Sequence, residues 1–376
     1  MKKTVLGQPS FRVANKQVEA FVTETGGHLG PVTFKFPGRK IAPYSVAPWA
    51  QEKLDPSIPP IIRALRGDFF CMPFGGNGSE FRGEKHPVHG EVANSKWRFE
   101  RIRKSSSSVW LELQLKTRIR KAHVRKLIAL LDGHHAVYSR HIIAGMRGSM
   151  PLGHHAMLKF PDEPGSGVIS TSPFVYGQTF YEPTENPEAR GYSILKPNAP
   201  FTSLREVPTI TGEMTDLTRY PARRGYEDIA MIVADPKLPF AWTAVTFPKQ
   251  RYVWFALKDP RVLRNTVFWI SNGGRHYAPW NGRHVNVMGL EEVTAYFHPG
   301  IAESVANNSL TKMGYPTSIK LDPKKPTTVN YIMALVEIPS GFDEVESIEQ
   351  SATGVTLSSQ SGKRVEAPLD LAFLQT

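Results

Sequence analysis

Residues 109–143, VWLELQLKTRIRKAHVRKLIALLDGHHAVYSRHII, carry the strongest fold signal in this chain of 376 residues. Apolar and polar side chains alternate at its start, where one face holds Val109, Leu111, Leu113, Leu115 and Ile119, and the other holds Glu112, Gln114, Lys116 and Arg118. This alternation predicts a half-buried strand, because successive side chains of a strand point to opposite faces. The Asp132-Gly133 pair between two further strand-like runs predicts a hairpin, since both residues readily take positive φ angles. The stretch therefore indicates consecutive antiparallel strands.

Strand-like runs continue along the chain at residues 229–233, 252–257, 266–270 and 329–338. The 31 prolines and 30 glycines require many turns and few long helices. Only two short helices are expected, one after Pro299 and one in the DEVESIEQS stretch after Gly341. Because strands and helices do not alternate, we predict an all-β, mainly antiparallel fold, a large sandwich with few short helices.

Residues 161–228 are rich in Pro, Gly, Ser, Thr and Glu, a composition typical of a domain linker or of long loops on a sandwich. Strand-like sequence of the same character resumes beyond them. We therefore expect one domain over residues 1–376, with a loop-rich excursion around residues 161–228.

The chain is basic, with 46 Lys and Arg against 34 Asp and Glu and a formal net charge of +12. Its basic clusters at residues 101–104 and 118–126 lie in strand-like stretches, and no nucleic-acid-binding motif accompanies them. We interpret them as solvated strand faces and expect no nucleic-acid partner. A phosphorylated or acidic small molecule stays open as the weaker alternative.

Cys71 is the one cysteine, so neither an internal disulfide nor a cysteine-based zinc site can form. The first residues lack the apolar core of a secretory signal, and no segment approaches the length of apolar sequence that spans a bilayer. These features predict a cytoplasmic location and no membrane association.

Three regions concentrate histidines and carboxylates: Asp68 to Trp97, with His86 and His89; Gly153 to Phe160, with the His154-His155 pair; and residues 280–294, with the Glu291-Glu292 pair. Taken alone, each region also has an ordinary structural explanation, as a turn, a core strand or an exposed edge. A metal site would draw on His86, His89, His155 and Glu291, but Pro87 and Gly90 disrupt the helix that would present the first two together. Acid and base catalysis on a sugar is the alternative, with indole faces for the ring and polar side chains for its hydroxyls.

The order of these motifs resembles the aldose 1-epimerase, or galactose mutarotase-like, superfamily. The stretch PFGGNG followed by HPVHGEVANSKW resembles its first histidine motif through Pro87, His89, Gly90 and Trp97. GHHAMLKF resembles its strand-borne histidine motif through His155, and MGLEEV resembles its late glutamate motif through Glu291. The motifs follow in the family's order and at similar spacing. Met157, Leu158 and the second glutamate of the Glu-Glu pair depart from the family's pattern.

The resemblance implies an antiparallel β supersandwich that needs no cofactor and interconverts the α and β anomers of an aldose or a modified or phosphorylated aldose. It implies that Glu291 takes the C1 hydroxyl proton, that His155 protonates the ring oxygen about one sugar ring away, and that His89 polarises the sugar. We expect substrate contacts from a further set: Asn77, Arg82, His86, His154, Arg283 and Glu292. A carbohydrate-binding protein without turnover, and a polysaccharide lyase or glycoside hydrolase on the same sandwich, are the alternatives. The oligomeric state stays open.

Overall fold

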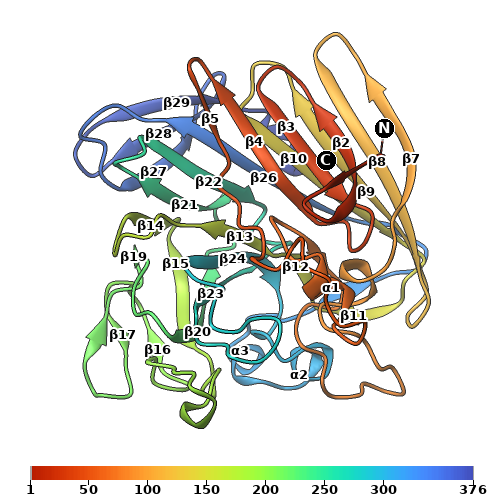
Figure 1. Ribbon diagram of the computed structural model, residues 1–376, viewed down its shortest axis with the longest axis vertical. Helices are drawn as coiled ribbons and strands as arrows, with labels where there is room; N and C mark the ends of the chain where they lie inside the picture. Colours follow the sequence, from red (N-terminus) through yellow and green to blue (C-terminus); the bar gives the residue numbers. More distant parts are fainter. Residues whose placement is uncertain (1, 376) are drawn as a thin grey trace.

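The structure is a computed structural model that describes residues 2–375. Strands hold 48% of the residues and helices 6%, which confirms the all-β prediction. Two large antiparallel sheets form the body of the molecule, and Figure 1 shows β21 and β22 in one layer and β20, β23 and β24 in the other.

The first large sheet has nine strands, in the order β19 (Arg219–Tyr220), β14 (Gly167–Thr171), β21 (Ala241–Phe247), β22 (Tyr252–Lys258), β26 (Thr327–Glu337), β10 (Ala136–Ala144), β9 (Ala122–Leu131), β8 (Ser108–Thr117) and β7 (Arg98–Lys104). The predicted hairpin joins β9 to β10 at Asp132-Gly133. β8 confirms the alternating strand, although Ile119 lies beyond its end and is partly exposed. Glu112, expected on the solvated face, is buried because Arg101 and Arg125 form ion pairs with it.

The second large sheet has eight strands, namely β16 (Pro200–Phe201), β15 (Phe174–Thr179), β20 (Tyr226–Ala234), β23 (Asn265–Asn272), β24 (Val287–Thr294), β12 (Leu152–His154) and β6 (Phe70–Cys71) in order, with β13 (Ala156–Lys159) also paired to β24. The interior between the large sheets contains Trp254, Phe268, Leu290 and Met333. Residues 161–228 thus supply strands to both sheets, besides the small pair β17 (Val207–Pro208) and β18 (Met214–Thr215).

Two smaller sheets extend the core. An N-terminal sheet of five strands, β1 (Lys2–Val5), β2 (Gln8–Ala14), β3 (Val18–Thr23), β4 (Leu29–Phe36) and β5 (Arg39–Ile41), packs against β8 and β9. A C-terminal sheet of β27 (Val345–Gln350), β28 (Gly354–Ser359) and β29 (Arg364–Pro368) covers the outer face of β21 and β22. A short pair joins β11 (Gly148–Met150) to β25 (Ile319–Leu321).

Helices are few and short, as predicted: α1 (Pro60–Arg63), α2 (Ile301–Val305) and α3 (Ser309–Lys312), with 3-10 turns at Glu91–Ala93, Pro187–Ala189 and Leu371–Gln375. The helix expected after Pro299 is α2. The helix expected after Gly341 is wrong, because that stretch forms β27. A bulge between Val345 and Ser347 shifts the alternation, so that Val345 and Ile348 both join the core at a spacing that imitates a helix.

Candidate active site

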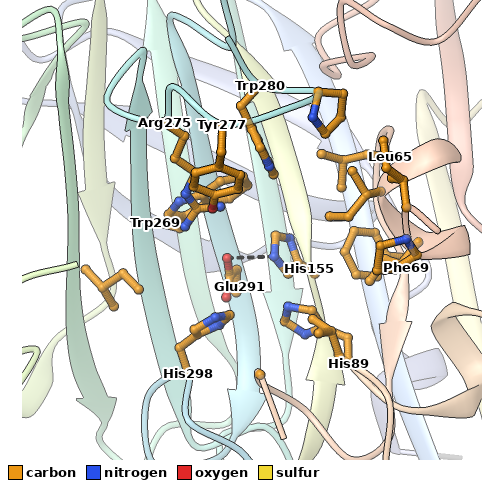
Figure 2. A pocket seen from close by; sticks show the side chains of 18 of the residues that line it. Leu65, Phe69, His89, His155, Trp269, Arg275, Tyr277, Trp280, Glu291 and His298 are labelled. Carbon is orange, nitrogen blue, oxygen red and sulfur yellow. Dashed lines mark ion pairs between the residues drawn. The ribbon is translucent and has the colours of Figure 1, made fainter. Parts of the chain in front are cut away.

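An open cavity of about 340 Å³ lies on the face of the eight-stranded sheet that points away from the nine-stranded sheet. The strands form its floor, residues 58–65 around α1 form one wall, and residues 275–280 form part of the rim. Figure 2 shows His155 and Glu291 on the floor, with Leu65 and Phe69 to one side and Trp269 and Arg275 to the other. The volume is within the range of small-molecule sites.

Strand alternation places Glu291 and His155 on this floor. In β24, Val287 and Val293 belong to the apolar cluster under the cavity, and Glu291, on the same face of the strand, lines the cavity itself. Gly289 stands opposite Trp269 in β23, and its missing side chain leaves room for the Glu291 carboxyl. His155 lies between β12 and β13, where its backbone N–H donates to the carbonyl of Phe69 at 2.9 Å.

His155 and Glu291 are in direct contact, with 3.0 Å between Nε2 and Oε1 (Figure 2). Burial raises the pKa of the Glu291 carboxyl well above its usual value, and Arg275 only partly offsets this. Burial also lowers the pKa of the His155 imidazole to about 3. Both effects favour an uncharged pair, a carboxylic acid against a neutral imidazole. The expected separation of one sugar ring between these two groups is therefore wrong.

His89 reaches the cavity from a turn rather than a helix. Its φ of 56° and that of Gly90, 77°, bend the chain sharply, and a Cβ at Gly90 would lie 1.9 Å from the Met72 carbonyl oxygen. The Gly75 N–H donates to His89 Nδ1 at 3.3 Å, so the neutral ring carries its proton on Nε2. The His89 ring centroid lies 5.0 Å from that of His155. Burial lowers the His89 pKa well below its usual value, which keeps the ring neutral.

His298, in the segment after β24, is a cavity residue that the sequence motifs do not indicate. Its ring centroid lies 5.4 Å from that of His89, and Figure 2 shows it beside Glu291 at the floor. Burial lowers its pKa to about 4, so it is an unprotonated imidazole at neutral pH. A histidine following an aromatic pair at the end of a strand is too weak a signal to identify it.

Arg275 and two tryptophans complete the rim. The Arg275 guanidinium carbon lies 5.2 Å from the Trp269 ring centroid and 4.8 Å from that of Trp280. Arg275 pairs with Glu185 at 2.9 Å and lies 3.7 Å from Glu227. Glu227 also accepts a hydrogen bond from Trp269 Nε1 at 3.2 Å, which fixes the indole. Glu185 therefore compensates the positive charge of Arg275, whereas burial raises the pKa of Glu227 to about 7, so that Glu227 is only partly ionised at neutral pH.

Glu292 and His154, expected to contact substrate, point into the core instead. Strand alternation sends Glu292 to the opposite face from Glu291, where it forms an ion pair with Lys258 and accepts a hydrogen bond from Thr266 Oγ1 at 2.7 Å. His154 is likewise opposite to His155 and forms a 2.8 Å contact with Asp68 Oδ2. Both faces of these strands are buried, so one residue of each pair faces the cavity and its neighbour faces the core between the two large sheets.

Four further expected contacts also lie outside the cavity. Asn77 is buried, and its amide donates to the carbonyl of Gly75 at 3.0 Å and accepts from the N–H of Ile301, so it holds loops together. Arg82 lies on an exposed turn against Phe81, His86 pairs with Glu84 at 2.8 Å, and Arg283 pairs with Glu52. None of these four side chains lines the cavity, although the neighbouring Gly76 and Val88 do, because each is engaged by partners elsewhere.

Among residues 2–375, no three or more histidine, cysteine, aspartate or glutamate side chains are grouped so that they could hold a metal ion. No helix in this part of the chain has the length and apolar character needed to cross a membrane.

Solved structures share this architecture. A galactose mutarotase-like protein from Clostridium acetobutylicum superposes with a TM-score of 0.60 at 11% identity, over 90% of this chain and 98% of that one. The galactose mutarotase related enzyme from Lactobacillus acidophilus superposes with a TM-score of 0.54 at 12% identity, over 88% and 99% of the two chains. No protein-family model and no curated protein sequence matches the chain. The chain therefore has the galactose mutarotase-like sandwich fold, as its three motifs predicted.

Proposed function

We propose that this protein interconverts the α and β anomers of a reducing aldose by general acid and base catalysis in the cavity. The observation that carries the proposal is the convergence of one carboxyl group and three imidazoles, Glu291 with His89, His155 and His298, in a single open cavity. The fold shared with mutarotase-like structures supports it. An anomerase needs no more than a proton donor and a proton acceptor near the C1 and ring oxygens.

The protonation states of Glu291 and His298 assign the roles of acid and base. Ring opening removes the proton from the C1 hydroxyl, breaks the bond from C1 to the ring oxygen and protonates that oxygen, which leaves an open-chain aldehyde. Glu291, kept protonated by burial, donates to the ring oxygen, and the neutral imidazole of His298 accepts from the hydroxyl. After rotation about the C1–C2 bond, the reverse transfers close the other anomer and restore both groups.

His89 and His155 support these transfers. His89 offers its Nε2 proton to a substrate oxygen, because its Nδ1 already accepts from Gly75. His155 stays in contact with Glu291, stacks on Phe69 with ring centroids 4.4 Å apart, and orients the carboxyl. We thus assign His155 as a positioning residue rather than as the free acid that the family resemblance implies.

The cavity favours a neutral sugar over an anionic one. Arg275 is the one cation among the residues that line it in the described part of the chain, and its charge is compensated by the ion pair with Glu185. Arg82 and Arg283, two of the expected substrate contacts, lie outside the cavity. Trp269 and Trp280 also line the cavity and add apolar surface for the C–H groups of a sugar.

The relaxation of freshly dissolved pure anomers, followed by polarimetry or NMR, tests the proposal. Wild-type protein should accelerate relaxation, and Glu291→Gln should reduce the acceleration at least ~10²-fold. Glu112→Gln is the matched control, because Glu112 is a buried strand glutamate outside the cavity. Sugar binding by both proteins without acceleration by either would favour a binding protein, and an unsaturated product from an acidic polysaccharide would indicate a lyase.

A further inference from the structure

One wall of the cavity contains no polar side chain. It is formed by the residues around α1 that line the cavity, namely Ile58, Pro59, Ile61, Ile62 and Leu65. Ile61 and Leu65 are anchored in the core, whereas Ile58 and Ile62 are only half-buried and meet the open cavity. We call these five residues the apolar wall.

The backbone of the apolar wall also has little to offer a ligand. Pro59 lacks an N–H, the N–H of Ile61 donates to Asn94 Oδ1 at 3.2 Å, and that of Ile62 donates to the Pro59 carbonyl at 3.0 Å. The Ile62 carbonyl accepts from Trp49 Nε1 at 2.8 Å. A sugar hydroxyl pressed against this wall would lose its water without gaining a partner, which disfavours binding.

The polar groups are concentrated elsewhere. Glu291, His89, His155 and His298 lie on or beside the strand floor, and Arg275 lies at the rim. Figure 2 shows Leu65 and Phe69 to one side of the His155–Glu291 pair, and Trp269 and Arg275 to the other. A substrate whose anomeric carbon and ring oxygen lie at Glu291 therefore projects its remote end over apolar surface.

We propose, resting on the function proposed above, that the substrate is a neutral reducing sugar with an apolar substituent, alkyl, deoxy or acyl, remote from its anomeric carbon. The sugar ring lies on the strand floor beside Trp269 and Trp280, and the substituent packs on the apolar wall. A free hexose leaves this wall uncovered. A sugar phosphate places a charge against it.

The probes are D-glucose, D-galactose and D-mannose, each with its 6-deoxy, 6-O-butyryl and 6-phosphate derivatives. Relaxation kinetics give kcat/KM, and calorimetry gives Kd without reference to turnover. Burial contributes ~4-fold per methylene, so the butyryl sugar of the preferred series should exceed its parent at least ~10-fold in both measurements. The 6-phosphate should be the poorest of the four.

Variants then locate the preference. Ile58→Thr and Ile62→Thr, alone and combined, should lower the ratio of butyryl to parent sugar severalfold, because each places a hydroxyl on the wall. Ile210→Thr is the matched control, since Ile210 is 61% exposed and outside the cavity, and it should leave the ratio unchanged. The single variants keep the test informative if the double variant does not fold.

The outcomes separate the two proposals. If the protein accelerates relaxation of free hexoses or 6-phosphates as well as that of the butyryl sugars, the substrate class is wrong and the anomerase function stands. Tighter binding of butyryl sugars that depends on Ile58 and Ile62, without any relaxation, would support the substrate class and refute the anomerase function. Absence of binding to every probe would overturn both.

Discussion

Replacing Gly289 by alanine should lower activity about 10²-fold while leaving the fold intact. The added Cβ would lie 2.6 Å from Glu291 Oε1 and 3.1 Å from Trp269 Cβ. Ordinary van der Waals contact begins at 3.4 Å, so Oε1 must move by about 0.8 Å. That movement disturbs the 3.0 Å contact with His155.

The two consequences differ in size. Misplacing a catalytic group by about 1 Å costs on the order of 10²-fold in rate, so kcat/KM for anomer relaxation should fall by roughly that factor. The free energy of unfolding should change by only ~1 kcal/mol, because the closest atom is the end of a flexible side chain and alanine suits a strand better than glycine.

Relaxation kinetics and urea unfolding of the same preparation measure both effects. Gly78→Ala is the control, because its Cβ would meet nothing within 4 Å. Wild-type kcat/KM in a folded Gly289→Ala protein would show that the Glu291 position does not limit the reaction. A loss of more than ~3 kcal/mol in the free energy of unfolding would show that the Glu291 carboxyl cannot move aside for the added methyl group.

Three further predictions concern titration and the buried ion pair. Since His298 must be unprotonated and its pKa is about 4, kcat/KM should fall below pH ~4, and His298→Asn should lower kcat without a stability loss; an unchanged rate would remove His298 from the mechanism. His28 is buried and its pKa is about 3, below the value near 6.5 of the unfolded chain, so unfolding between these pH values takes up a proton and the free energy of unfolding falls as pH drops. In urea titrations, the dependence of this free energy on pH should be smaller for His28→Gln by up to ~1.4 kcal/mol per pH unit. An unchanged pH dependence would contradict the low pKa of His28. Lys258→Met leaves the Glu292 carboxylate unpaired and should cost ~3–5 kcal/mol by urea unfolding, much of it recovered by adding Glu292→Gln; additive losses would contradict the coupling.

Sequence alternation identified the strands and the paired candidates, but it was unable to select between neighbours. In the stretch MGLEEV, apolar residues flank the Glu-Glu pair on both sides because both faces of β24 are buried. Only the packing of β24 shows that Glu291 faces the cavity and Glu292 faces Lys258. The same reason explains why His154 and His155 were indistinguishable.

Residues delivered by loops were harder to predict. His298 and Arg275 follow different strands, and only the tertiary fold brings them to the same cavity as His89. Conversely, Arg82 and His86 are close to His89 in sequence, but Arg82 packs against Phe81 and His86 pairs with Glu84, so neither lines the cavity. The failed helix after Gly341 has a local cause, since a bulge in β27 gave the apolar residues a helical spacing.

Saturation-transfer NMR on equilibrated sugars tests most directly whether the cavity around Glu291 exchanges anomers. Irradiating the α-anomeric proton in the presence of wild-type protein should attenuate the β signal of the preferred sugar, and Glu291→Gln should abolish the transfer while Glu112→Gln preserves it. Transfer that persists in folded Glu291→Gln, or its absence from wild type with a sugar shown to bind, would contradict the account.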